Sequence, residues 1–323
     1  MAHYIVTGSS GFIGSHTCES LLLDGHTITG IDNMNDAYDV IIKEHRLKKL
    51  KQHPNFIFSN VDITDLNALQ KIINDRYDSI INLGARAGVR ASADNPFIYY
   101  DTNVTGTLNL LEISKQYEIP KFVLASTSSV YGSVNSIPYS ENDLTDFPLS
   151  QNAASKKAAE TLTHTYHNLY GLDVTILRYF TVYGPAGRPD MSIMRFIKWI
   201  IEKEEIHLFG DGTQSREFTY VGDIAKGTIA GMKEVGYEII NLGSDHPVSL
   251  LEVISIIEKI TDNKAIIKYL PESPLDIKAT WADINKAKTI LEWEPSVNIE
   301  KGINECINWY LQNRDWAKNI VLF

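Results

Sequence analysis

The sequence predicts an α/β protein with a doubly wound parallel sheet and a smaller, interleaved C-terminal α/β lobe. Short apolar runs alternate with longer amphipathic stretches through the first half, which is typical of parallel strands covered by helices on both faces. The Gly-rich run TGSSGFIG lies between the first expected strand and the first expected helix. After about Phe180 the alternation loosens at the Pro/Gly-rich run VYGPAGRPDM, which indicates a second lobe.

The expected elements follow one another in a regular order. Apolar runs predict strands at 4–8, 27–32, 55–60, 79–84, 121–126 and 173–180, and amphipathic stretches predict helices near 12–24, 43–52, 64–76, 96–118 and 152–170. Beyond them we expect a helix at 192–204, strands at 206–210 and 237–243, and helices near 249–261, 283–291 and 299–312. The run FTYVGDIAKGTIAGMKEV is expected to return to the first domain. We therefore expect a first domain of residues 1–178 plus about 219–245, and a second lobe of residues 179–218 plus 246–323.

Composition narrows the class of protein. The net charge of -10 over 323 residues and the pI near 5.4 argue against a nucleic-acid-binding surface. Cys18 and Cys306 cannot build a disulfide framework, and the histidines lack metal-ligand spacing, so we expect free thiols and no metal site. There is no signal-peptide pattern and no apolar run of roughly 18 residues, so we expect a cytoplasmic protein without a membrane segment.

The Gly-rich run indicates a dinucleotide site in a Rossmann-type domain. Gly8, Gly11 and Gly14 follow the pattern G-x-x-G-x-x-G. Glycines allow the backbone to approach a pyrophosphate closely, and the following helix offers free N–H groups and the positive end of its dipole. A plain strand–helix turn is the alternative interpretation.

Three later strand ends extend this site. Asp32 follows Gly14 by 18 residues, and a carboxylate there accepts hydrogen bonds from ribose hydroxyls and repels a 2′-phosphate, which favours NAD over NADP. A capping or turn aspartate is the alternative. Asp62 and Ile63 in VDITD are expected beside the adenine, and the small residues of LGARAG, among them Gly84 and Ala85, allow the chain to lie against the dinucleotide.

Ten motifs occur in the order found in a known family. They resemble the extended short-chain dehydrogenase/reductase family of NAD-dependent nucleotide-sugar epimerases and dehydratases over nearly the whole chain. The run YFTVYGPAGRPDM is most similar to the UDP-glucuronate 4-epimerase branch. The motifs are TGSSGFIGSH, IDN, VDITD, LGARAGVR, NVTGTLNLLE, STSSVYG, AASKKAAE, YFTVYGPAGRPDM, SREFTYVGDIAKG and NLGS.

The resemblance implies hydride removal from C4 of a UDP-hexose to NAD. A tyrosine in Y-x-x-x-K takes the hydroxyl proton, and the lysine lowers the pKa of that tyrosine and binds the nicotinamide ribose. Lys156 matches the lysine, Thr127 and Ser128 match the hydroxyl region, and Asn152 stands in the tyrosine position. The resemblance and the motifs together imply NAD contacts from Gly8, Gly11, Phe12, Ile13, Gly14, Asp32, Asn33, Asp62, Ile63, Leu83, Gly84, Ala85, Ser126, Lys156 and Tyr179.

The second lobe is expected to bind the nucleotide sugar. The resemblance implies that Arg216 binds the UDP diphosphate and that Asp276 holds the uridine ribose, whereas a surface ion pair and an ordinary loop aspartate are the alternatives. Arg188 is expected at the sugar or a diphosphate, or as a brace of its own loop. Thr181 stands where related enzymes hold the sugar-diphosphate, and Leu208 belongs to the strand whose backbone lines the uracil site.

Asn152 leaves three hypotheses open, because an amide cannot act as a general base near neutral pH. The chain is a dead or altered variant, a protein that binds NAD and nucleotide sugar without chemistry, or an enzyme whose C4 alcohol is already activated. The third hypothesis resembles the tyrosine-lacking Pal branch of bacterial pseudaminic acid biosynthesis. That branch is implied to convert UDP-6-deoxy-GlcNAc-5,6-ene into UDP-4-keto-6-deoxy-L-AltNAc. Ser128 and Ser129 stand where the dehydratase branch has an Asp-Glu pair, so water elimination is not expected.

Two further expectations come from the same resemblance. Tyr131 and Tyr179 are phenols near the reaction centre, with packing or cofactor contact as the alternative to proton transfer. The helices at 96–118 and 152–170 are those that the family pairs across a two-fold axis as a four-helix bundle. We therefore expect a homodimer that uses a UDP-sugar substrate, with packing of both helices on their own sheet as the alternative.

Overall fold

The computed structural model describes residues 1–73, 76–133, 135–272 and 278–322. Within them, the central sheet has seven parallel strands in the order β3-β2-β1-β4-β5-β6-β10. Its strands are β1 (His3–Thr7), β2 (Thr27–Asp32), β3 (Phe56–Asn60), β4 (Ser79–Asn82), β5 (Lys121–Thr127), β6 (Asp173–Tyr179) and β10 (Tyr237–Leu242). The predicted doubly wound parallel sheet is therefore confirmed.

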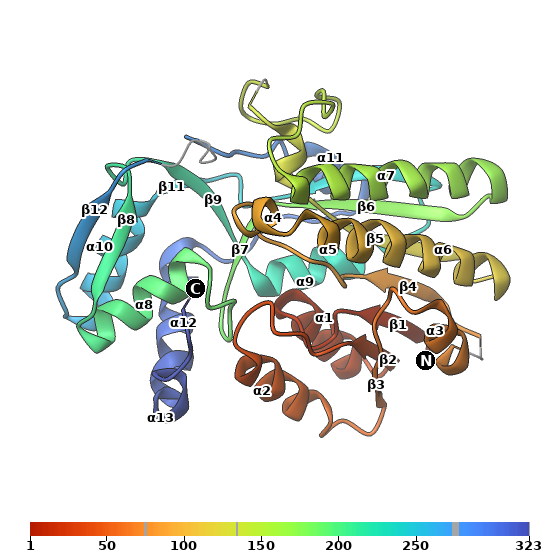
Figure 1. Cartoon of the computed structure of the whole chain (residues 1–323), viewed down its shortest axis with the longest axis horizontal. Coiled ribbons are helices and arrows are strands. Elements are labelled where there is room, and N and C mark those ends of the chain that lie inside the picture. Colours follow the sequence, from red (N-terminus) through yellow and green to blue (C-terminus); the bar gives the residue numbers. More distant parts are fainter. Residues whose placement is uncertain (74–75, 134, 273–277, 323) are drawn as a thin grey trace.

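Helices cover both faces of this sheet, as Figure 1 shows. On one face, α1 (Phe12–Leu23), α2 (Val40–Leu50) and α9 (Val221–Ala230) share an apolar core with the strands, including Leu21, Leu50 and Ile224. On the other face, α3 (Leu66–Ile72), α6 (Gly106–Gln116) and α7 (Gln151–Tyr170) bury side chains such as Leu69 and Leu110. Helix α9, which belongs to the run expected to return to the first domain, packs beside α1.

Short helical turns precede the helices that line the site. The expected helix near 96–118 consists of α5 (Pro96–Tyr100), the π-turn η1 (Asp101–Thr105) and α6, and α4 (Ala91–Asp94) comes just before it. A 3₁₀ turn, η2 (Ser128–Tyr131), follows β5 directly. Ser150 caps α7, because its hydroxyl accepts a hydrogen bond from the Ala153 N–H at 3.2 Å.

The second lobe has its own apolar core. A three-stranded sheet joins β7 (Thr181–Tyr183), β9 (Ser215–Tyr220) and β11 (Pro247–Ser249), and β8 (Glu205–Phe209) pairs with β12 (Ile266–Leu270). The core lies mainly between α8 (Ser192–Glu202), α10 (Leu250–Thr261) and α12 (Ile299–Gln312). Of the two remaining short helices, α13 (Arg314–Ala317) packs against α12, whereas α11 (Asn285–Ile290) packs against β10 of the central sheet.

The expected elements are found, with boundaries that differ by a few residues. The sequence did not predict α4, η2, α9 and α13, nor four short strands. The four strands are β7, β9, β11 and β12. These strands have three to six residues, which is too short for an alternating pattern of apolar and polar residues to be recognised. The strand β12 is also largely exposed, with Ile266 and Tyr269 more than half accessible. The division into two domains by residue range stays a prediction.

No helix in the described ranges is both long and apolar enough to cross a membrane. The same ranges contain no group of three or more His, Cys, Asp or Glu side chains suited to a metal ion. Cys18 and Cys306 are buried and unpaired with each other.

Candidate active site

The Gly-rich loop is packed too tightly for any larger residue. A Cβ built on Gly14 would lie 2.0 Å from the Gly8 carbonyl oxygen, and one on Gly8 would lie 2.8 Å from the Gly84 nitrogen. Gly8 also has a φ of +65°, which favours glycine. The end of β1 therefore turns directly under the end of β4, and α1 begins at Phe12 with its free N–H groups facing this edge of the sheet.

Asp32 lies at the carboxyl end of β2 and supports the same loop. Its carboxylate accepts hydrogen bonds from the Ser10 N–H at 3.1 Å and the Met34 N–H at 2.9 Å. The Ser9 and Ser10 hydroxyl oxygens are buried and have no hydrogen-bond partner in the described structure. Because a buried, unpaired hydroxyl costs about 1–3 kcal/mol, this loop is suited to a ligand that brings acceptor oxygens.

Asn33 and Asp62 form the adjoining wall. The Asn33 amide donates to the Asp62 carboxylate at 2.6 Å. Burial raises the pKa of Asp62, but hydrogen bonds from Thr64 and Asn33 outweigh burial and hold the pKa below its ordinary value. Ile63 is buried beside them, against Gly106 of α6. The structure thus brings the residues predicted for the adenosine end together at one sheet edge.

The fourth strand supplies the middle of the cleft. Gly84 donates its N–H to the Thr7 hydroxyl at 3.0 Å, and Thr7 donates to Asn82 at 2.7 Å. Leu83 and Ala85 are partly exposed on either side of Gly84. Because these contacts involve a backbone N–H and short side chains, the end of β4 stays open beside the Gly-rich loop.

Lys156 and the β5 end form the centre of the site. The Lys156 ammonium is buried and donates to the Ala125 carbonyl oxygen at 2.7 Å. Burial lowers the pKa of Lys156 to about 8, although the Glu160 carboxylate opposes this change. Thr127 is partly exposed, and its hydroxyl accepts the Ser129 N–H at 3.2 Å. Ser128 follows it, also partly exposed.

Asn152 occupies the first turn of α7, four residues before Lys156. Its side chain is 5 % exposed. Its Oδ1 atom is buried and has no hydrogen-bond partner among the described residues. Among the described residues, the Asn152 amide therefore has an unpaired acceptor oxygen, one helical turn before the buried Lys156 of α7.

The two nearby phenols are already engaged. Tyr131 is buried, donates to Asn241 at 2.6 Å, and accepts from Arg178 at 3.0 Å. Burial raises the pKa of Tyr131 to about 12. Burial also raises the pKa of Tyr179 well above its ordinary value, and its hydroxyl is 2.8 Å from that of Thr228 on α9. Neither phenol is placed as a proton-transfer group, and a cofactor contact from Tyr179 stays a prediction.

Arg188 lies in the loop after β7, where it forms an ion pair with Asp190. Its Nε and Nη2 atoms donate to the two carboxylate oxygens at 3.0 and 2.6 Å. Its guanidinium also lies 5.8 Å from the ring centre of Tyr38. This arrangement supports the bracing role that the sequence left open, with 22 % of the side chain still accessible.

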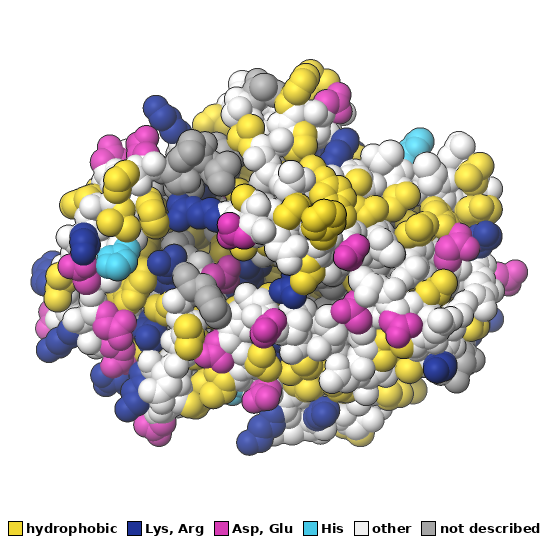
Figure 2. All heavy atoms as spheres, viewed as in Figure 1, with side chains coloured by type: hydrophobic (Ala, Val, Ile, Leu, Met, Phe, Trp, Pro, Cys, Tyr) yellow, Lys and Arg dark blue, Asp and Glu magenta, His cyan; other side chains and the backbone are white. Residues whose placement is uncertain are grey.

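The remaining predicted substrate residues spread along the second lobe. Arg216 in β9 donates to the Ser215 carbonyl at 2.8 Å, and Thr181 is partly exposed at the start of β7. Leu208 packs into the core of the lobe, so only its backbone is available to a ligand. Asp276 lies outside the described residues. Figure 2 shows a hollow between the two lobes with Lys and Arg side chains on its walls.

Sequence reasoning missed three arginines around the cleft. Arg46 of α2 is buried and donates to the Ala186 carbonyl at 2.6 and 3.1 Å and to Ser10 at 3.3 Å, which ties the Gly-rich loop to the loop after β7. The Arg90 guanidinium lies 4.2 Å from the Phe209 ring centre. The Arg195 Nε atom is buried without a hydrogen-bond partner in the described structure. The contacts of Arg46 and Arg90 join segments that are distant in sequence, so no local pattern marks these two residues.

Fold and site together define a dinucleotide-dependent enzyme of the short-chain dehydrogenase/reductase class. The Gly-rich loop, Asp32 and the unpaired serine hydroxyls fit NAD, and NAD is the cofactor of the similar structures described below. Residues 5–306 match the family model described as GDP-mannose 4,6 dehydratase. The chain belongs to this family of extended, NAD-dependent nucleotide-sugar enzymes.

Several similar proteins are epimerases, two of them UDP-glucuronate 4-epimerases. A UDP-glucuronate 4-epimerase of Thermodesulfobacterium geofontis is 53% identical over 322 residues, which cover 99% of each chain. The UDP-glucuronic acid 4-epimerase of Bacillus cereus, solved with UDP-glucuronic acid and NAD, is 38% identical with a TM-score of 0.89, covering 96% of this chain and 99% of that one. The epimerase Mth375 of Methanothermobacter thermautotrophicus is 28% identical with a TM-score of 0.92, covering 100% and 96%.

Proposed function

We propose that this protein is an NAD-dependent enzyme that acts at C4 of a UDP-hexose that is already activated for oxidation. The favoured reaction converts UDP-6-deoxy-GlcNAc-5,6-ene into UDP-4-keto-6-deoxy-L-AltNAc. The proposal rests on Asn152, which stands where the family resemblance implies a catalytic tyrosine and whose buried Oδ1 atom has no hydrogen-bond partner among the described residues. A UDP-glucuronate 4-epimerase and a non-catalytic NAD and UDP-sugar binder are the competing functions.

The chemistry of the favoured substrate compensates for the absent phenol. A positioned general base contributes roughly 100- to 10,000-fold to a proton transfer, which is about 3–5 kcal/mol of barrier. With a 5,6-double bond the C4 alcohol is allylic, so its oxidation gives a conjugated enone and needs less help from a base. Asn152 offers an amide that binds a hydroxyl without changing its charge state.

The atoms balance as an isomerisation. Bound NAD would supply the hydride chemistry, with the C4 hydride removed and then returned at C6. The C4 hydroxyl proton leaves, and one proton is added at C5, where its direction sets the configuration. Thr127 and Ser128 hold the C4 oxygen with their hydroxyls, and the Lys156 ammonium stabilises negative charge that develops there.

UDP-glucuronate 4-epimerisation is the second candidate. It is supported by the 53% identical relative, and by Arg188, whose guanidinium suits a substrate carboxylate if Asp190 releases it. A Tyr-to-Phe mutant of the Bacillus cereus enzyme was solved with UDP-4-deoxy-4-fluoro-glucuronic acid and NAD. Ligand binding without one tyrosine hydroxyl therefore has a precedent, and binding alone does not separate the candidates.

One assay separates the three functions. The purified, NAD-loaded protein would be incubated with UDP-6-deoxy-GlcNAc-5,6-ene, UDP-GlcNAc and UDP-glucuronate, and the products followed by NMR. We expect turnover of the 5,6-ene alone, with deuterium from solvent appearing at C5. Turnover of UDP-glucuronate alone would establish the second candidate. If NAD and UDP stay bound but no sugar is turned over, the protein is a non-catalytic binder of NAD and UDP-sugar.

We also propose a homodimer in the cytoplasm, with residues 1–178 plus about 219–245 binding NAD and the rest binding the UDP-sugar. The dimer is supported by large apolar side chains exposed on α5, α6 and α7, where Figure 2 shows many apolar atoms. They are Phe97, Tyr100, Leu108, Leu169 and Tyr170. Pairing of these helices across a two-fold axis would cover them.

A further inference from the structure

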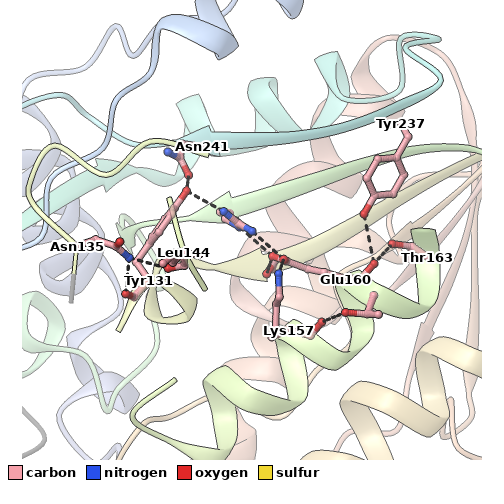
Figure 3. Close-up of polar contacts among 11 residues, drawn as sticks. Tyr131, Asn135, Leu144, Lys157, Glu160, Thr163, Tyr237 and Asn241 are labelled. Atoms are coloured by element: carbon pink, nitrogen blue, oxygen red, sulfur yellow. Dashed lines mark hydrogen bonds and ion pairs between the residues drawn. The ribbon is translucent and has the colours of Figure 1, made fainter. Parts of the chain in front are cut away.

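A buried ion pair joins α7 to the central sheet behind the reaction centre. Arg178 of β6 donates to Glu160 of α7 through Nε at 3.0 Å and Nη2 at 2.8 Å, and both side chains are about 1 % exposed. Arg178 also donates to the Tyr131 hydroxyl at 3.0 Å, and Tyr131 donates to Asn241 at 2.6 Å. Figure 3 shows these contacts running from Glu160 of α7 to Asn241 by way of an arginine and Tyr131.

The strand register explains why these groups meet. Ser126 of β5 pairs with Arg178 of β6, and Arg178 pairs with Asn241 of β10. The three residues therefore form one polar row across three neighbouring strands. Glu160 covers the row from above, and it also accepts the Ser126 hydroxyl at 2.6 Å.

The row reaches Lys156 by two routes. Glu160 follows Lys156 by one helical turn, so the two side chains share a face of α7. Ser126 follows Ala125, whose carbonyl accepts the Lys156 ammonium at 2.7 Å. Glu160 thus holds Ser126, which is the strand residue next to the Ala125 carbonyl that accepts the Lys156 ammonium. Glu160 also places a carboxylate near the lysine.

We infer that Glu160 is a positioning residue of the reaction centre, which keeps Lys156 protonated and fixed against β5 through the buried row of Ser126, Arg178 and Asn241. The inference rests on the proposed role of Lys156 as the cation at the C4 oxygen. With Asn152 in place of a phenol, an ammonium is the group left to stabilise charge there, so its protonation state matters more than in a tyrosine-containing site.

The charges around the pair favour this assignment. Burial lowers the pKa of Lys156, and Glu160 is the charged group that raises it. Two cations contact the Glu160 carboxylate, Arg178 from β6 at 2.8 Å and Lys157 from α7 at 3.8 Å. The 3₁₀ turn η2 and β10 contribute the phenols Tyr131 and Tyr237, whose pKa values burial raises. Neither phenol adds a charge near neutral pH.

The test measures the Lys156 pKa itself on the NAD-loaded protein. Side-chain ¹⁵N resonances of labelled lysine would be titrated by NMR, with the Lys156 signal assigned from its loss in Lys156→Arg. We expect Glu160→Gln to lower that pKa by about one, a tenfold change in the protonated ratio. The double variant Glu160→Gln/Arg178→Met removes both charges and should give an intermediate pKa, which also covers the case in which the single variant does not fold.

Tyr166→Phe is the control, because Tyr166 also anchors α7 by its hydroxyl, through a part-buried hydrogen bond to Glu112 of α6. It should lower the melting temperature without moving the Lys156 pKa. An unchanged Lys156 pKa in Glu160→Gln or in the double variant, beside a similar loss of stability, would overturn the inference and leave a structural ion pair. A shifted pKa in a protein that turns over no UDP-sugar would instead overturn the proposed function and keep this inference.

Discussion

The Arg188 guanidinium is held by Asp190 two residues later, with Nη2 and Oδ2 2.6 Å apart. Arg188 lowers the pKa of this carboxyl, although burial acts in the opposite direction. An arginine neutralised by its own loop is a poor receptor for a substrate carboxylate, because a new anion must compete with a pair that is already formed. We therefore predict that this ion pair influences which UDP-sugar the chain accepts.

Asp190→Asn should make Arg188 available to a substrate carboxylate. The asparagine can still accept a hydrogen bond from Arg188, but it no longer neutralises the guanidinium. We expect the affinity for UDP-glucuronate relative to UDP-GlcNAc to rise about 5- to 10-fold, measured by calorimetry at fixed ionic strength. Asp211→Asn, in an exposed turn of the same lobe, should leave the ratio unchanged. An unaltered ratio in Asp190→Asn would remove Arg188 from the sugar site.

Asn152→Tyr should supply a phenolic general base at this position. A phenol one turn before Lys156 would gain the lysine's charge as a neighbour, which lowers its pKa. We expect NAD reduction or C4 epimerisation of ordinary UDP-hexoses to increase by roughly 100-fold or more, followed by absorbance of NADH and NMR of the sugars. Asn152→Phe adds the ring without the hydroxyl and should give no increase. Equal activities of the two variants would contradict the role of the hydroxyl.

Lys156→Met should stabilise the fold while it removes activity. The pKa of Lys156 falls from 10.5 to about 8 on burial, so its charge destabilises the folded state fully below pH 8 and not at all above about pH 10.5. Replacing it should raise the free energy of unfolding at pH 7 by about 1–3 kcal/mol, after the lost bond to Ala125 is deducted. The gain should shrink as pH rises from 8 to 10.5, measured by urea unfolding. A loss of stability at pH 7 would mean that the ammonium is a structural anchor.

Ser10→Ala should weaken NAD binding without weakening the fold. The Ser10 hydroxyl oxygen is buried and unpaired within the described structure, so its removal costs the cofactor-free protein nothing. We expect the affinity for NAD to fall about 5- to 10-fold, by tryptophan fluorescence or calorimetry after the cofactor is stripped. Ser79→Ala is the control, since the Ser79 hydroxyl is equally buried and unpaired but lies at the opposite, amino end of β4. A matching loss in both variants would exclude a specific role for Ser10.

The paired variant Phe97→Asp/Leu169→Asp should separate the proposed dimer. Phe97 is 78% exposed on α5 and Leu169 is 66% exposed on α7, and two charges on a face that pairs with its own copy would be buried or repelled. Light scattering with size exclusion should show a monomer. Leu23→Asp, at a 73% exposed position of α1, should leave the mass unchanged. A native protein that is already monomeric would refute the dimer directly.

The sequence predicted much of the fold and the cofactor edge because both depend on local patterns. The alternation of strands and helices fixed the parallel sheet, and Gly8 and Gly14 marked a turn that no larger residue can make. The four short strands of the second lobe were missed because so few residues carry little alternation, and only their pairing with remote segments, such as β12 with β8, defines them.

The sequence by itself determined the dinucleotide loop, the family and the position of Asn152 beside Lys156, since glycine spacing and helical periodicity are local properties. Only the tertiary structure decided that Tyr131 and Tyr179 are engaged elsewhere, that Arg46 links two distant loops, and that Glu160 lies within a buried row. Hydrogen bonds and burial depend on which strands become neighbours, and three-dimensional packing alone sets the protonation of a buried lysine.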